Sequence, residues 1–206
     1  MDFAFSEEQC LIRDSFRGAL RELVNIDRVR RAVEAEQHVD TTLWTSLIGM
    51  GMSGLMIAEE FGGAGLGLLE AAVVAEELGR TAAPVPFAAT VVMVPLALSS
   101  ALDSAAQRAW LPGLADGDTR MGLAIPEAAA GKRHGQGIAV TDGKLSGQTP
   151  FALDASGATA LMICDQDGGL HLVSCDDPGI EFRAFESIDG TRSVADLTLK
   201  HVPATP

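Results

Sequence analysis

A cluster of glycines separates two apolar segments in the first half of the chain, and this break constrains the fold more than any other feature. The glycines between positions 62 and 67 cannot continue a helix, because glycine loses too much backbone entropy there. The next segment, from Leu68 to Leu78, has apolar residues at helical spacing, with Gly79 as the expected left-handed residue that stops the helix. A helix that is apolar on most of its circumference belongs inside a bundle, so other helices must surround it. Glycines this dense allow close approach of the backbone to a ligand or to another helix, and a tight loop needed only for packing is an equal alternative.

Other helices are expected on both sides of this break. Ser6 and Gln9 form a capping-box pattern that predicts a helix from there to about residue 24. Arg13, Arg17 and Arg21 lie on one face of it; a basic stripe can hold a phosphate, but a solvated face of salt bridges is favoured. The remaining helices are expected after Asp40, over 87–102 with a kink or restart around Pro95, and over 105–111, ended by Pro112-Gly113.

From about residue 120 the apolar pattern changes to short strands and turns. Asp142-Gly143 lies between two short runs and is a strong signal for a two-residue hairpin. A second hairpin is expected between 158–163 and 170–174, with further strands at 121–125, 180–182 and 193–199. The sequence therefore predicts an α+β fold, with an all-helical bundle domain over 1–117 and a small antiparallel, barrel-like β domain over 118–206.

Charge and cysteine content exclude several classes of function. The net charge of −13 argues against nucleic acid as a partner and against docking onto anionic membranes. No apolar run reaches the ~20 residues of a membrane span, and no signal peptide opens the chain. The three cysteines form no C-x-x-C motif, so we expect reduced thiols in a cytoplasmic protein. The four histidines share no metal-ligand spacing, and no metal site is expected.

Several separated motifs of this chain resemble motifs of the flavin-dependent acyl-CoA dehydrogenases and occur in the same order as in that family. The glycine break and its helix, EEFGGAGLGLLEAAVVAEELGR, resemble the signature of that family's N-terminal helical domain. The stretches 123–132 and 145–153 resemble the segments with which the family's β domain holds the flavin, and the loop 189–192 also matches. The resemblance implies an FAD cofactor and a set of candidate binding residues: Leu123, Ile125 and Pro126 along the isoalloxazine, Gly131 and Lys132 near the phosphates, and Phe151, Ala152 and Leu153 on the other flank of the ring system.

The departures from the family pattern concern hydrogen bonds to the cofactor. Pro126 stands where the family usually has a threonine whose hydroxyl bonds the flavin ring, and Leu153 where it has a threonine or serine. Each lost neutral hydrogen bond is worth roughly 1 kcal/mol net. Lys132 and Arg133 replace the usual Ser-Asp; they either pair with a phosphate or are exposed loop cations.

The resemblance implies α,β-dehydrogenation of an acyl-CoA thioester, with electron-transfer flavoprotein or a similar protein as electron acceptor. It covers the N-terminal helical and middle β domains, and the family's C-terminal helical domain, which supplies the catalytic glutamate, is not represented in this chain. No residue of the chain is therefore expected to be catalytic. The alternative is a non-catalytic partner subunit or fragment that completes a flavin site and serves assembly in a hetero-oligomer. In either case we expect a homo- or hetero-oligomer.

Overall fold

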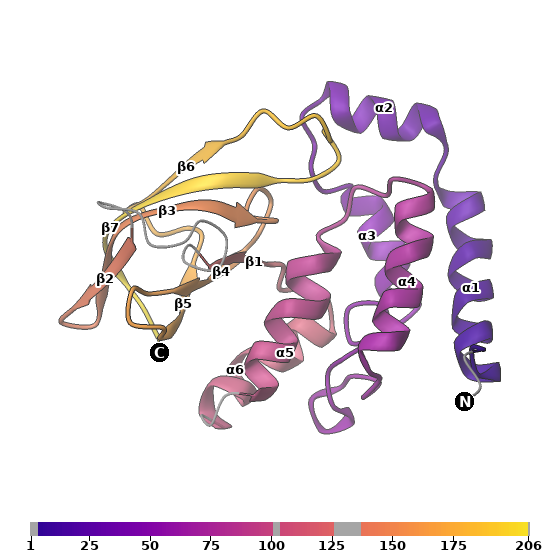
Figure 1. Cartoon of the computed structure of the whole chain (residues 1–206), viewed down its shortest axis with the longest axis horizontal. Coiled ribbons are helices and arrows are strands. Elements are labelled where there is room, and N and C mark those ends of the chain that lie inside the picture. Colours follow the sequence, from indigo (N-terminus) through magenta and orange to yellow (C-terminus); the bar gives the residue numbers. More distant parts are fainter. Residues whose placement is uncertain (1–3, 101–103, 126–136, 206) are drawn as a thin grey trace.

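The structure, a computed structural model, describes residues 4–100, 104–125 and 137–205 of the chain. Helices occupy one half of the molecule and a curled sheet the other, with α5 (Val94–Ser100) and α6 (Ser104–Ala115) lying next to the sheet (Figure 1). The predicted α+β class is confirmed. Within the described part of the chain, no helix is long and apolar enough to cross a membrane.

The first helices start where side chains cap them. Ser6 Oγ accepts from the Gln9 amide at 3.1 Å and the Ser6 amide donates back to Gln9 Oε1 at 2.9 Å, which confirms the capping box. Asp40 caps the next predicted helix, while a short helix between the two was not predicted. The helical elements of this half, besides α5 and α6, are α1 (Glu7–Leu23), α2 (Ile26–Glu34), α3 (Thr41–Ile48), a 3-10 turn (Glu59–Phe61), α4 (Leu68–Arg80) and the π-helix η2 (Ala88–Met93).

The glycine break folds back onto the chain just before it. The amides of Ala64 and Gly65 donate to the carbonyls of Gly54 and Ile57 at 2.9 and 2.8 Å. A Cβ on Gly63 would lie 2.0 Å from the Ile57 carbonyl oxygen, so only glycine fits there. At Gly63 the close approach is therefore made to the chain itself, which favours the packing alternative over a ligand.

Two predicted helix ends are wrong. Gly79 does not stop α4, because the helix continues to Arg80 and closes at Thr81, whose hydroxyl donates to the Leu78 carbonyl at 3.1 Å. Pro112 does not end α6, which continues to Ala115. Burial of Leu114, which is fully enclosed, outweighs the missing proline N–H. By contrast, the change from π-helix to α-helix at Val94 confirms the predicted restart next to Pro95.

The other half is a seven-stranded mixed sheet in the order β5-β4-β1-β3-β7-β6, with β2 paired to β3. Both predicted hairpins are present, β2–β3 around Asp142-Gly143 and β4–β5. The expected purely antiparallel pairing is wrong at one place, because β1 and β4 run parallel. The β2–β3 hairpin lies between these two strands in the chain and forms the crossover connection that parallel strands need. The strands are β1 (Met121–Ala124), β2 (Gly137–Thr141), β3 (Lys144–Leu153), β4 (Ala160–Cys164), β5 (Leu170–Ser174), β6 (Ile180–Ala184) and β7 (Val194–Pro203).

A shared core and a few polar contacts join the two halves. One apolar cluster contains residues of η2, α5 and α6 together with residues of β1, β4 and β5. Around it, Thr90 Oγ1 bonds both the amide and the carbonyl of Met121, at 3.0 and 3.1 Å. Asp154, buried after β3, accepts from the Ala89 amide at 3.0 Å. The sheet is thus held at a defined position against η2.

Candidate cofactor-binding surface

Two of the segments expected at the flavin lie side by side at the end of the sheet near the helices. β1 and β3 pair antiparallel with Leu123 opposite Leu153. Ile125 and Leu153 are half-buried at the edge of the core that the two halves share. Pro126, Gly131 and Lys132 lie outside the described residues.

The described candidates differ in how accessible their side chains are. Leu123 is 4% exposed and Ala152 is fully buried, so these two side chains belong to the core beneath the exposed candidates and cannot contact a ligand directly. Phe151 is 41% exposed. Among the five described candidates, Phe151 therefore offers the largest open side chain to a ligand.

A β-bulge turns Phe151 outward. The pairing of β3 with β7 shifts register between Thr149 and Ala152, and Phe151 has φ +59°. This left-handed conformation is uncommon for a bulky residue, and such outliers cluster at functional sites. The bulge places Ala152 in the core while the Phe151 ring projects from the sheet.

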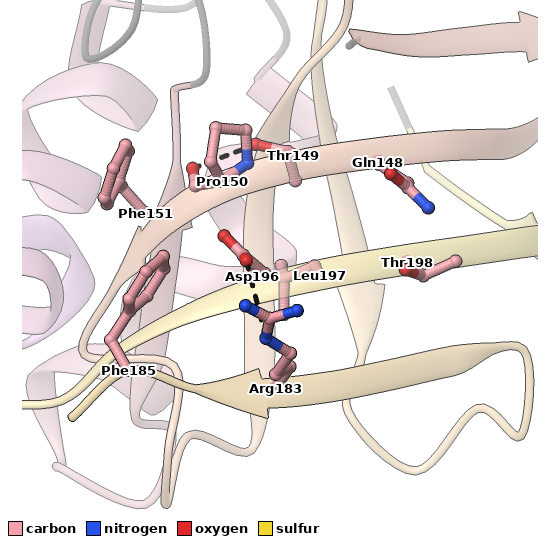
Figure 2. A pocket seen from close by; sticks show the side chains of 9 residues that line it. All are labelled: Gln148, Thr149, Pro150, Phe151, Arg183, Phe185, Asp196, Leu197 and Thr198. Atoms are coloured by element: carbon pink, nitrogen blue, oxygen red, sulfur yellow. Dashed lines mark hydrogen bonds and ion pairs between the residues drawn. The ribbon is translucent and has the colours of Figure 1, made fainter. Parts of the chain in front are cut away.

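The Phe151 ring is stacked on Phe185, which directly follows β6. The ring centroids are 5.1 Å apart and the planes differ by 15°. The Phe185 amide donates to the Val194 carbonyl at 2.9 Å, which extends the β6–β7 ladder by one residue. Figure 2 shows the two rings side by side at one end of a pocket.

This pocket has a volume of about 250 Å³ and an aromatic end and a polar end. At the polar end, Asp196 Oδ2 lies 4.0 Å from Arg183 Nε, and Asp196 Oδ1 is buried with no hydrogen-bond partner among the described residues. The aromatic end suits a flat ring, while the polar end carries a carboxylate and a guanidinium that can bond polar groups of a ligand. The lining residues are Gln148, Thr149, Pro150, Phe151, Arg183, Phe185, Asp196, Leu197 and Thr198.

The sequence did not reveal Arg183, Phe185 or Asp196 as site residues. Asp196 falls within the strand expected at 193–199 with no role assigned to it, and Arg183 lies just beyond the strand expected at 180–182. All three come close to Phe151 because β3 pairs with β7, which is distant from it in sequence, and β7 pairs in turn with β6. The one available signal was an aromatic residue, Phe185, in the connection that leads to the loop 189–192.

A second cavity, of about 410 Å³, lies between α1 and α4 and contains part of the arginine stripe. Arg17 donates to both carboxylate oxygens of Glu77, at 2.9 and 2.6 Å, and this pairing lowers the pKa of the buried Glu77 carboxyl. Arg80 Nε lies 3.4 Å from the same carboxylate. The cations at this cavity are thus largely neutralised by α4 itself, as the salt-bridge interpretation predicts. Among the described residues, no group of histidine, cysteine or acidic side chains is arranged to hold a metal ion.

A model of the acyl-CoA dehydrogenase N-terminal domain matches residues 6–118. The chain therefore belongs to the acyl-CoA dehydrogenase family. Acyl-CoA dehydrogenase IpdE2 of Mycobacterium tuberculosis is 30% identical over 209 residues, which are 95% of this chain and 64% of that relative. IpdE2 of Mycolicibacterium smegmatis is 42% identical over 86 residues, 41% of this chain and 28% of the relative. The chain thus spans less than two thirds of the length of these curated acyl-CoA dehydrogenases.

Several solved structures have the same fold as this chain. The Tcur3481-Tcur3483 steroid ACAD, a variant, is 35% identical with a TM-score of 0.81, over 96% of this chain and 56% of its own. The ChsE4-ChsE5 complex from Mycobacterium tuberculosis is 26% identical with a TM-score of 0.85, over 100% and 57%. The FAD complex of PigA, at 21% identity and a TM-score of 0.79, covers 99% of this chain and 58% of its own and shows likeness of fold alone.

Proposed function

We propose that this chain forms the helical and β portions of a flavin-dependent acyl-CoA dehydrogenase and supplies one wall of its FAD site. The observation that carries the proposal is the Phe151 ring. It is turned out of the sheet by a bulge, stacked on Phe185 and 41% exposed, at the segment where the family places the flavin. Ile125 and Leu153 lie half-buried at the neighbouring strand ends and extend this wall.

The residues present fit an isoalloxazine ring, and each has a physical role. The Phe151 ring gives the flavin an apolar face to pack against, worth about 0.5–1.5 kcal/mol beyond area burial. Ile125 and Leu153 exclude water from the edge of the ring. FAD, when bound, supplies the acceptor for the hydride that leaves the β carbon of the acyl-CoA thioester. The protein's part is to hold acceptor and substrate in line, and no residue of this chain is assigned as the base that removes the α proton.

The substrate and acceptor follow the family. One structural relative is a steroid ACAD, which supports a steroid-derived acyl-CoA as the first thioester to test. Electron-transfer flavoprotein or a similar protein is the proposed electron acceptor. We expect the full-length protein, purified with FAD, to reduce an artificial acceptor when given an acyl-CoA thioester, and the 206-residue chain with added FAD to show no such turnover. Turnover by the chain alone would refute the assignment of the base to another part of the protein.

The second candidate is a partner subunit that completes a flavin site in a hetero-oligomer. Two observations support it: the lost hydroxyls at Pro126 and Leu153, and the similarity of this chain to a chain of the ChsE4-ChsE5 complex. This candidate predicts that the full-length protein retains FAD and activity only when co-purified with a second acyl-CoA dehydrogenase subunit. Full activity of a homo-oligomer would rule it out.

A further inference from the structure

We propose that Phe185 is a positioning residue that holds the Phe151 ring in the orientation that receives the flavin. The inference rests on the proposed function and adds a residue to it. The motif resemblance did not single out Phe185, which reaches the site only because β6 pairs with β7 and β7 with β3.

Phe151 needs such a support because its own surroundings do not fix it. Its backbone is in the left-handed region at φ +59°, and its side chain is 41% exposed. An exposed side chain on a bulge can exchange between rotamers unless another group holds it. In the described part of the chain, the one ring stacked on Phe151 is that of Phe185, at 5.1 Å and 15°.

Phe185 is itself well placed to act as that support. Its amide bonds the Val194 carbonyl at 2.9 Å, and Ala184, just before it, pairs with Ala195 in the sheet. Phe185 is half-buried and so less exposed than Phe151. In Figure 2, Phe185 rises from the end of β6 toward Phe151, on the side of the β6–β7 connection.

The stack occupies one face of the Phe151 ring, and the side chain is 41% exposed, so we place the ligand on its other face. A flat ring bound there would form a three-layer stack with Phe185 at the back. Removing Phe185 leaves the contact surface of Phe151 in place but frees its rotation, so the side chain must be immobilised when FAD binds. Ordering one side chain in this way corresponds to a loss of about three- to tenfold in affinity.

The test is a double-mutant cycle on FAD affinity in the full-length protein, measured by fluorescence titration of the apo form. We expect Phe185→Ala to raise the Kd about three- to tenfold, and Phe185→Tyr, which keeps the ring, to leave it near wild type. In a Phe151→Ala background, Phe185→Ala should have no further effect, because Phe185 acts through Phe151. The visible absorption band of bound FAD should shift in the same direction in Phe185→Ala and in Phe151→Ala.

Phe182→Ala is the matched control, since Phe182 is a 42% exposed phenylalanine of β6, three residues before Phe185, and does not line the pocket. It should change neither the Kd nor the spectrum. An unchanged Kd in Phe185→Ala, or additive effects of the two alanines, would overturn the role of Phe185 while leaving the flavin site in place. A wild-type protein that binds no FAD would refute the proposed function and this inference with it.

Discussion

The Asp40 carboxylate pairs with Arg28 of α2 and also caps α3. Replacing Asp40 should separate the contribution of the ion pair to stability from that of the cap. Its oxygens accept from Arg28 Nε and Nη2 at 2.6 and 2.8 Å, and Oδ1 also accepts from the Leu43 amide at 2.9 Å as the cap of α3. A hydrogen bond to a charged group contributes about 1.5–3 kcal/mol, and an N-cap about 1 kcal/mol. Asp40→Asn keeps an oxygen for the cap and should lower the free energy of unfolding by about 2 kcal/mol. Asp40→Ala removes both contacts and should lower it by about 3 kcal/mol.

The pH dependence of the stability difference distinguishes the Arg28–Asp40 ion pair from the cap. Arg28 lowers the pKa of Asp40 below its ordinary value of 3.8 in the folded protein. The stabilisation is therefore fully present above the unfolded pKa and is lost as the pH falls through the lowered folded value. The difference between wild type and Asp40→Asn should be constant near neutrality and shrink below about pH 4.

Urea unfolding followed by tryptophan fluorescence measures these free energies of unfolding in the full-length protein. Trp44 serves as the probe because it is buried in α3 and its indole donates to the Gly117 carbonyl at 3.1 Å. Exposed Asp27→Asn is the matched control and should be neutral, since its carboxylate lies 3.9 Å from Arg30 in open solvent. Equal stability of Asp40→Asn and wild type at pH 7, or a difference that grows in acid, would refute the reasoning.

Three further perturbations test other parts of the structure. Burial raises the pKa of Asp154, so the free energy of unfolding of the wild type falls as the pH rises through the raised folded value and the carboxyl ionises. Asp154→Asn can still accept from the Ala89 amide and should be more stable than wild type at high pH and equal to it in acid, as measured by urea unfolding across pH. Gly63→Ala should lower the free energy of unfolding by about 1–3 kcal/mol or prevent folding, because its Cβ would meet the Ile57 carbonyl. Burial raises the pKa of the Cys175 thiol to about 11, so iodoacetamide at pH 8 should label it far more slowly in the native than in the unfolded protein, and equal rates would contradict its burial.

Local signals were enough to predict the features that depend on a few consecutive residues. Ser6 with Gln9 and Asp142-Gly143 define their cap and hairpin through neighbours in the sequence, and the structure has both. The end of α6 could not be read in this way, because burial of Leu114 against distant elements carries the helix past Pro112.

The same limit applies to the candidate site. Family resemblance drew attention to Phe151, but the stack with Phe185 depends on strands paired across the sheet. The left-handed φ of Phe151 follows from a register shift against β7, which no pattern within β3 reveals. Parallel pairing of β1 with β4 was missed for the same reason, since a crossover leaves no mark in the alternation of either strand.

The central claim is that the end of β3 forms a wall of the FAD site, and the affinity of full-length Phe151→Ala for FAD tests it most directly. The mutation removes the open ring of the site, and loss of stacking together with lost burial should raise the Kd by about tenfold or more, at ~1.4 kcal/mol per factor of ten. Phe182→Ala, an equally exposed phenylalanine outside the pocket, should bind FAD as wild type does. An FAD Kd unchanged by Phe151→Ala would show that this surface does not face the flavin and would contradict the account.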